Sequence, residues 1–379
     1  MNFNFISPQN IYFGCGKIDM LTELVKPYSS PIMLVISKAV KSNSKVSQII
    51  RDIESSHKVV TFDNVSGEPT ENIVNECTRM AKDNNVKLII SIGGGSVIDT
   101  AKATAGFATN NGKLTDYIEG VGIGKVLDNM PIDHIAIPTT SGTGSEMTKN
   151  AVIKGEDKKF KRSFRHNKLV PVATIIDPEL SVSVPRSTTA YSGMDAITQL
   201  IESYISKKSN PFTDALALDG LKKAGKSLLN AYNDGENIEA RTNMAYASMI
   251  SGMCLANSGL GAVHGIAAGL GAVLGIPHGM ACSILLPHVI KLNGPHIKEK
   301  SASLCIALTG SCTNNHQKDT NAIIDYIDNM IDKLNIPKNF KDIGITKETA
   351  LEVIKYSSSS NMGGNPYPIT QEDILGILV

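Results

Sequence analysis

The first half of the chain alternates short, almost wholly apolar runs with longer segments in which apolar residues recur at helical spacing. Apolar runs of five to seven residues are typical of strands that are covered on both faces, as in a parallel sheet. The predicted strands are 31–37, 58–62, 87–93, 133–138 and 172–177. Their alternation with helices predicts a parallel α/β sheet of the Rossmann type.

After Pro178 the pattern changes, and apolar positions recur at helical spacing without a convincing strand. The clearest helical segments are 193–206, 213–232, 237–257 and 318–334. A proline-bounded extended stretch at 177–185 separates the two patterns. The sequence therefore predicts an α/β domain over residues 1–180 and an all-helical domain over residues 181–379.

One uncharged stretch is long enough to be compared with a membrane helix. Residues 242–290 contain no Asp, Glu, Lys or Arg, and 259–277 approach the length that spans a bilayer. His264 lies in the middle of that segment, and its glycines suit interior helices that pack closely. We therefore expect buried helices and no membrane partner.

Charge and cysteine content narrow the class of partner. The 379 residues carry 37 basic and 36 acidic side chains, a net charge of +1, which gives no field to attract nucleic acid. The six cysteines are scattered without a C-x-x-C pair, and the first residues lack a basic region followed by an apolar run. We expect small-molecule partners and a cytoplasmic location.

Two loops at the ends of predicted strands have the composition of phosphate-binding loops. "IISIGGGSVIDTAK" (89–102) places three glycines before a helix, where positive φ angles, close backbone approach and the helix N-terminus favour a diphosphate. "IPTTSGTGSE" (137–146) supplies several hydroxyls around two glycines. Each loop alone is also typical of an ordinary tight or solvated turn. Because both follow parallel strands, together they predict a dinucleotide site.

The end of the first predicted strand bears on the choice of dinucleotide. Ser37 and Lys38 stand where dinucleotide-binding folds often place an acidic residue that binds the ribose 2′-hydroxyl. A hydroxyl and a cation would accept a 2′-phosphate that a carboxylate would repel. This pattern favours NADP(H) over NAD(H), although a lysine facing water would give the same sequence.

The predicted helix 193–206 carries the first part of a candidate metal site. Asp195 and Gln199 lie one turn apart on one face, with Glu202 beside them. Such a stripe is also typical of a solvated helix face. His264 and His278 lie in the uncharged segment that we expect to be buried, and buried imidazoles need partners. Two histidines with an aspartate are typical of a metal site.

Five motifs in this order and spacing resemble the iron-containing (group III) alcohol dehydrogenase family over essentially the whole chain. They are "GGGSVIDTAK", "PTTSGTGSE", "GMDAITQLIESY", "GAVHGIAAGLGAVLGIPHGMACSILLPHVIKLN" and "MGGNPYPIT". The resemblance implies a Rossmann-like N-terminal domain, a helical C-terminal domain and a fold shared with dehydroquinate synthase. It also implies NAD(P)-linked alcohol or aldehyde oxidoreduction, a divalent metal in the cleft between domains, and a homodimer.

The resemblance assigns roles to individual positions. The metal ligands, among which Asp195 and His278 are also expected to act in catalysis, fall on Asp195, Gln199, His264 and His278. The cofactor-binding positions fall on Ser37, Lys38, Gly94, Gly95, Ser96, Asp99, Thr139, Thr140, Thr143, Ser145, Lys161 and Leu180.

The chain departs from the family pattern at two positions. The ligand four residues after Asp195 is usually a histidine and here is Gln199, and an often-present histidine four residues after His264 is here Ala268. An amide oxygen is a harder, weaker ligand than imidazole, so affinity for iron(II) or zinc should fall and tolerance of harder cations should rise.

Other interpretations remain open from the sequence. The basic segment 158–168 can be a solvated loop, or it can hold an anionic group of the substrate or the 2′-phosphate through Arg162, Arg165 or His166. A cyclising lyase of the dehydroquinate synthase type and a metal-free, non-catalytic paralogue are the alternative functions. The favoured prediction is a metal-assisted NAD(P)-dependent dehydrogenase of a small alcohol or aldehyde.

Overall fold

The computed structural model describes residues 2–156, 160–357 and 359–379, and the chain divides into two compact units. The sheet unit comprises Ile6–Thr140 and Ser145–Ser181. The helical unit comprises Met1–Phe5, Ser141–Gly144 and Val182–Val379.

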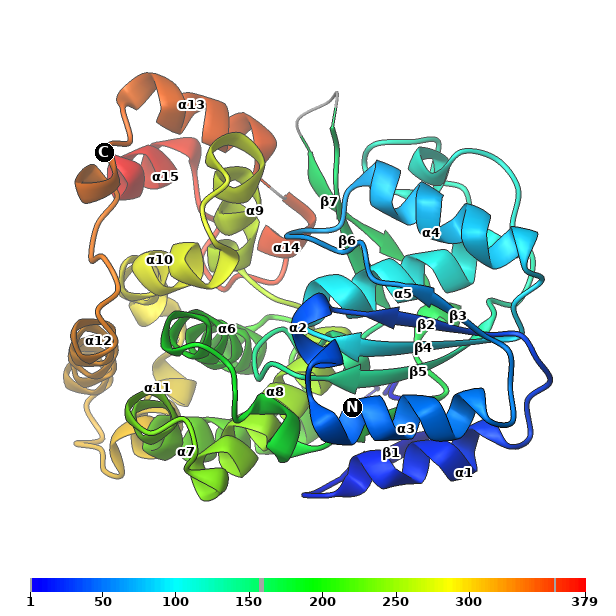
Figure 1. The fold of residues 1–379 in the computed structure, drawn as a ribbon. Helices are drawn as coiled ribbons and strands as arrows, with labels where there is room; N and C mark the ends of the chain where they lie inside the picture. The colour runs from blue at the N-terminus through cyan, green and yellow to red at the C-terminus, as the bar shows by residue number, and fades with distance from the viewer. Residues whose placement is uncertain (1, 157–159, 358) are drawn as a thin grey trace. The chain divides into compact units, whose positions relative to one another are not determined.

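The sheet unit is built on six parallel strands in the order β1-β8-β5-β4-β2-β3 (Figure 1). The strands are β1 (Asn10–Phe13), β2 (Ile32–Ile36), β3 (Val59–Phe62), β4 (Leu88–Gly93), β5 (Asp133–Pro138) and β8 (Ala173–Ile176). Five of them are the predicted strands, and the predicted parallel α/β fold is confirmed. β1 was not predicted, because this four-residue edge strand is only partly buried and reads as "NIYF".

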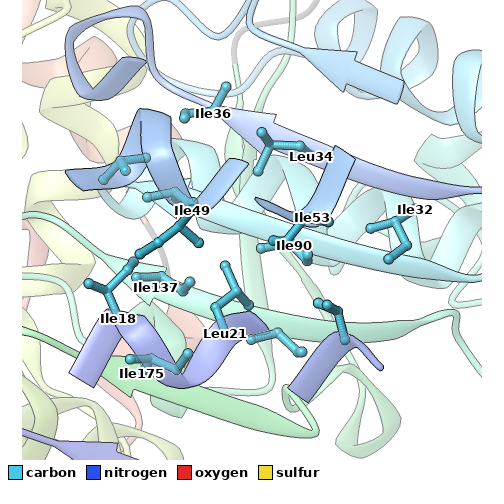
Figure 2. Packing of buried hydrophobic residues seen from close by; sticks show 14 of the residues in the cluster. Ile18, Leu21, Ile32, Leu34, Ile36, Ile49, Ile53, Ile90, Ile137 and Ile175 are labelled. Atoms are coloured by element: carbon cyan, nitrogen blue, oxygen red, sulfur yellow. The ribbon is translucent and has the colours of Figure 1, made fainter. Parts of the chain in front are cut away.

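Alternate residues of the central strands pack into two separate hydrophobic cores, one on each face of the sheet. Ile32, Leu34 and Ile36 of β2 pack with residues of α1 (Leu21–Val25) and α3 (Ser44–Glu54), as Figure 2 shows. Met33 and Val35 point to the other face, where α4 (Glu71–Asp83) and α5 (Gly95–Ala108) cover the sheet. Burial on both faces explains why these strands are apolar at every position.

An antiparallel hairpin, β6 (Asn150–Lys154) with β7 (Lys161–Arg165), was not predicted. Its second strand falls in the basic segment 158–168, of which Lys158 and Lys159 lie outside the described residues. Phe164 points into a third apolar cluster, whereas Arg165 is exposed. The sequence of β7 gives no strand signal, because Phe164 is its only apolar residue.

The helical unit contains ten α-helices among its described residues. They are α6 (Arg186–Ile205), α7 (Pro211–Asn233), α8 (Ile238–Ser258), α9 (Ala262–Leu274), α10 (His278–Asn293), α11 (Lys298–Thr309), α12 (His316–Lys333), α13 (Lys347–Tyr356), α14 (Ser359–Met362) and α15 (Gln371–Leu378). Local sequence sets several helix starts: Asn210 accepts hydrogen bonds from Phe212 and Thr213 at the start of α7, with Pro211 in the first turn. The predicted helical C-terminal half is confirmed.

Helix α6 is the central helix of this unit, and its polar stripe is not solvated. Every residue of α6 from Gly193 to Ile205 is buried, including Asp195, Gln199 and Glu202. The interpretation of these polar residues as a solvent-facing stripe is therefore wrong. Three buried polar side chains on one helix require partners within the protein.

No single helix among the described residues is long and apolar enough to span a membrane. Helices α8 and α9 meet the length and composition criteria only as a joined pair, and they bend by 102° at the break between them. The uncharged segment 259–277 thus contains the sharp turn that follows α8 and the whole of α9, most of whose residues are buried.

A buried histidine in β5 predicts an acid-sensitive fold. Burial, and next the positive charge of Lys102, lower the pKa of His134 to about 3, and its Nε2 lies 2.8 Å from Ser91 Oγ. The unfolded chain takes up a proton near the ordinary histidine pKa of 6.5, whereas the folded chain does so only near 3. Stability contributed by neutral His134 is therefore complete above that unfolded value and is lost as pH falls towards 3, by up to about 1.4 kcal/mol per pH unit.

Urea titrations at several pH values test this expectation. His134→Gln should flatten the fall in unfolding free energy across that window, because glutamine does not titrate. Substitution of the exposed His296 by glutamine is the control and should leave the slope unchanged. Equal slopes for the wild type and His134→Gln would contradict the assignment.

Candidate metal centre and cofactor loops

Four side chains from three helices converge in the helical unit. Asp195 comes from α6, His264 from α9, and His278 and Cys282 from α10, and one ligand atom of each lies within 4.8 Å of the others. Asp195 Oδ1 is 3.2 Å from His264 Nε2 and 3.7 Å from His278 Nε2. Carboxylate, imidazole and thiolate together form a donor set that suits zinc or another divalent transition metal.

Glu202, two turns along α6 from Asp195, positions His264. Its carboxylate accepts hydrogen bonds from His264 Nδ1 at 2.6 Å and from the backbone N–H of Val263 at 2.6 Å. Because Nδ1 carries the donated proton, the lone pair of Nε2 can face a cation. A carboxylate behind a histidine ligand is the usual way in which proteins fix its tautomer and ring orientation.

One imidazole and the thiol of this cluster have shifted pKa values. Burial lowers the pKa of His264, but the neighbouring Cys282, Asp195 and Glu202 outweigh burial and raise it well above 6.5. Burial raises the pKa of the Cys282 thiol to about 11. A bound cation would displace protons from both groups, because a metal is ligated by the unprotonated imidazole nitrogen and by the thiolate.

Gln199 lies one turn after Asp195, and both polar atoms of its amide are hydrogen-bonded to neighbouring side chains. Its Nε2 donates to Asp195 Oδ2 at 3.3 Å, and its Oε1 accepts from Ser251 Oγ of α8 at 2.9 Å. The amide thus presents its nitrogen to Asp195 and its carbonyl oxygen to Ser251. Ala268, one turn after His264, is also buried and adds no polar group.

Cys282 is the residue of this cluster that sequence reasoning missed. It lies one turn after His278 on α10, at the spacing that puts two side chains on one helix face. The run "HGMACSILL" is otherwise apolar, and a lone buried cysteine is usually a small core residue. The only signal in the sequence was the spacing of Cys282 from His278. The packing of α10 beside α9 brings this thiol close to His264.

The first glycine loop follows β4 and opens α5. None of Gly93, Gly94 and Gly95 has a positive φ, so the structure does not use the left-handed backbone that these glycines permit. Gly93 packs closely against the following helix, because a Cβ there would lie 2.6 Å from Val97 Cγ2. Gly94 is the N-cap of α5 and has no side-chain cap, and Ser96 is partly exposed in the first turn. The helix N–H groups there can donate to a phosphate.

The second loop begins beside the first. The N–H of Thr139 donates to Gly93 O at 3.0 Å, and a Cβ on Gly94 would lie 3.3 Å from Thr140 Oγ1. The next residues, Ser141–Gly144, including the exposed Thr143, belong to the helical unit. Gly144 there has φ +58°, and a Cβ on it would lie 2.5 Å from Gly252 Cα. A glycine is required at Gly144 on both grounds.

Asp99 and Ser145, both predicted to bind cofactor, lie in a buried network around Lys102. Asp99 accepts hydrogen bonds from Ser145 Oγ and, at 2.9 Å, from the N–H of Val152. Lys102 Nζ donates to Ser145 O at 2.6 Å and to Asn150 O at 2.6 Å. Burial raises the pKa of Asp99 and lowers that of Lys102 to about 8. This network holds the end of the second loop against α5.

The remaining predicted cofactor residues differ in their surroundings. Ser37 is partly exposed at the start of α2 (Lys38–Lys41), and Lys38 is exposed. Lys161 is buried and pairs with Glu68. Leu180 packs in the core cluster that also contains Ile18.

The sequence matches two family descriptions that together cover nearly the whole chain. Residues 8–178 match "Iron-containing alcohol dehydrogenase", and residues 189–379 match "Fe-containing alcohol dehydrogenase family, C-terminal".

Individual relatives match over similar lengths. Alcohol dehydrogenase 4 of Saccharomyces cerevisiae is 33% identical over 382 residues, covering 99% of this chain and 97% of its own length. The NAD-dependent methanol dehydrogenase of Bacillus methanolicus is 36% identical over 266 residues, covering 70% of this chain and 69% of its own.

Solved structures show the same fold. A 1,3-propanediol oxidoreductase superposes with a TM-score of 0.92 at 30% identity, covering 100% of this chain and 99% of the other. An alcohol dehydrogenase from Oenococcus oeni superposes with a TM-score of 0.91 at 31% identity, covering 99% of each chain. The chain belongs to the iron-containing alcohol dehydrogenase family.

Proposed function

We propose that this protein is a metal-assisted, NAD(P)-dependent dehydrogenase that interconverts a small alcohol and its aldehyde. The observation that carries this proposal is the buried cluster of Asp195, His264 and His278, with Glu202 behind His264. The two loops at the carboxyl ends of β4 and β5 supply a cofactor site of the kind that open α/β sheets use. The relatives named above are alcohol, methanol and propanediol oxidoreductases, which supports the reaction class.

The residues present fit a divalent metal, and Asp195, His264 and His278 would hold it. A bound metal would polarise an aldehyde oxygen or lower the pKa of an alcohol, while the nicotinamide exchanges hydride with the carbon. His264 is kept in the orientation that suits this task by Glu202. Ala268 leaves no second imidazole one turn after His264, so proton exchange would pass through water or the cofactor ribose or in the neighbourhood of His278, which is partly exposed.

We further propose a preference for NADP(H). The support is local: β2 ends in Ser37 in place of a carboxylate, and the exposed Lys38 follows. Lys41, one turn after Lys38 on the same helix, is already paired with Asp63. The Bacillus methanolicus relative is described as NAD-dependent, so the proposed preference would differ from the cofactor use of that relative.

Ser37→Asp tests that preference. The new carboxylate would repel a 2′-phosphate, so kcat/KM with NADPH should fall at least about tenfold relative to kcat/KM with NADH. Ser37→Ala is the matched control and should change the ratio little, because it adds no charge. A wild-type enzyme that already prefers NADH, or a ratio unaffected by Ser37→Asp, would contradict the assignment.

The function itself is tested by metal analysis of protein purified without added metal, together with NADPH and NADH oxidation over a panel of aldehydes. Bound metal and net cofactor oxidation are expected. A synthase of the dehydroquinate type would show no net cofactor turnover, and a non-catalytic paralogue would show neither metal nor oxidation. Including anionic aldehydes in the panel tests whether the basic residues of β7 select a charged substrate.

Two further expectations accompany this proposal. A homodimer is proposed on the family resemblance, and the mass of the protein in solution tests it. A reducing, cytoplasmic location is proposed because all six cysteines are free thiols.

A further inference from the structure

We propose that Cys282, and not Gln199, supplies the fourth protein ligand of the metal, beside Asp195, His264 and His278. This inference rests on the proposed function, because it concerns the metal that the dehydrogenase reaction would use. It changes the expected donor set from two imidazoles, a carboxylate and an amide oxygen to two imidazoles, a carboxylate and a thiolate.

The distances around Cys282 fit a single four-coordinate ion. Its Sγ lies 3.8 Å from His278 Nε2 and 4.0 Å from His264 Nε2. In a tetrahedral zinc site, bonds of about 2.05 Å to nitrogen and about 2.3 Å to sulfur place those two atoms about 3.6 Å apart. Nitrogen and carboxylate ligand atoms lie about 3.3 Å apart in the same geometry. The two sulfur-to-nitrogen distances therefore need to contract by only a few tenths of an ångström. The distances from Asp195 Oδ1 to His264 Nε2 and to His278 Nε2, 3.2 and 3.7 Å, lie on either side of the ideal nitrogen-to-oxygen distance.

The backbone already aims the thiol at this point. Cys282 follows His278 by one turn of α10, so both side chains project from the same face of one helix. Cys282 has 0% of its surface exposed and His264 has 4%. A thiol held there by a helix needs no loop rearrangement to reach the ion.

Gln199 is less suited to the role. The oxygen with which an amide can ligate a metal accepts a hydrogen bond from Ser251 Oγ at 2.9 Å. The amide nitrogen, which cannot ligate, donates to Asp195 Oδ2 at 3.3 Å. Gln199 thus holds the second carboxylate oxygen of Asp195, while Oδ1 remains directed at both histidines. Its role is to position Asp195.

The bond change is balanced without a further reactant. The Sγ–H bond breaks, the proton leaves to solvent, and the thiolate donates its electron pair to the divalent cation. A thiolate is a soft ligand, so this donor set favours zinc, cobalt or cadmium over hard cations. This preference is opposite to the tolerance of hard cations expected for an amide ligand at position 199.

Cobalt(II) substitution tests the proposal on the full chain, with a spectroscopic readout that does not depend on activity. Wild-type protein loaded with one equivalent of cobalt should show an intense near-ultraviolet sulfur-to-cobalt charge-transfer band. Cys282→Ser should lose the band and bind cobalt at least about tenfold more weakly. Gln199→Leu, which keeps the volume but removes both polar atoms, should retain the band.

Cys254→Ser is the matched control, since Cys254 is a buried cysteine of the same unit that lies outside the cluster. It should retain the band and the cobalt affinity. Cobalt bound by the wild type without a charge-transfer band would overturn the proposal while leaving the metal-dependent function intact. No cobalt binding by the wild type would overturn both.

Discussion

Replacing His264 with alanine is expected to lower kcat/KM for aldehyde reduction at least about thousandfold and to remove bound metal. The imidazole Nε2 lies 3.2 Å from Asp195 Oδ1 and is one of the candidate ligand atoms, and the His264 side chain is buried. Loss of Lewis-acid stabilisation amounts to several kcal/mol, and each 1.4 kcal/mol corresponds to a factor of about ten. Steady-state kinetics with metal analysis of the same preparation measure both effects.

Glu202→Gln is the graded control for that experiment. It keeps the shape of the side chain but removes the charge that accepts the His264 Nδ1 proton, so metal affinity or activity should fall only about 10- to 100-fold. The circular dichroism spectrum of each variant should match that of the wild type. A His264→Ala enzyme that retains metal and more than a tenth of wild-type kcat/KM would show that the cluster is not the reaction centre.

Replacing Lys102 with methionine is expected to destabilise the protein by about 3–5 kcal/mol. Methionine nearly preserves the volume, but it leaves the carbonyl oxygens of Ser145 and Asn150 without their buried donor. It also removes the positive charge that lies 3.8 Å from the buried Asp99 carboxyl. Loss of one partner from a buried charged network costs far more than loss of a surface pair. Urea unfolding at neutral pH measures the change in free energy.

Lys26→Met provides the surface control. Lys26 pairs with Glu23 at 2.6 Å, but both side chains are mostly exposed, so the free energy should change by less than about 1 kcal/mol. A change of similar size at Lys102 would show that the network around Asp99 adds little to the stability of the sheet unit. The Lys102 variant should also bind NADPH more weakly, because the loop containing Ser145 would lose its support.

The sequence predicts most of the sheet, because strands buried on both faces are apolar at every position. Ile32–Ile36 and Leu88–Gly93 are recognisable for that reason. β1 and β7 were missed, since an edge strand and a hairpin strand outside the main sheet keep polar residues. Their pairing depends on contacts with distant strands that no local pattern records, such as Asn10 beside Ala173.

The candidate metal site shows a different limit of sequence reasoning. Asp195, His264 and His278 were named from residue type and family resemblance, and the structure brings them together on three helices. The orientation of the Gln199 amide and the approach of Cys282 follow from how α8 and α10 pack, which residue spacing alone does not encode. The glycines of 93–95 permit a positive φ that they do not adopt, and close contact with Val97 accounts for glycine at Gly93.

The assignment of Ser141–Gly144 to the helical unit has a practical consequence for dissecting the gene. The chain passes from one unit to the other four times, after residues 5, 140, 144 and 181. A fragment that stops at residue 180 would contain Gly142 and Gly144 but would lack Ser192 and Gly252, against which those glycines pack. Dividing the chain at a single position therefore cannot yield two intact units. An exchange of the helical unit between relatives must also transfer Ser141–Gly144.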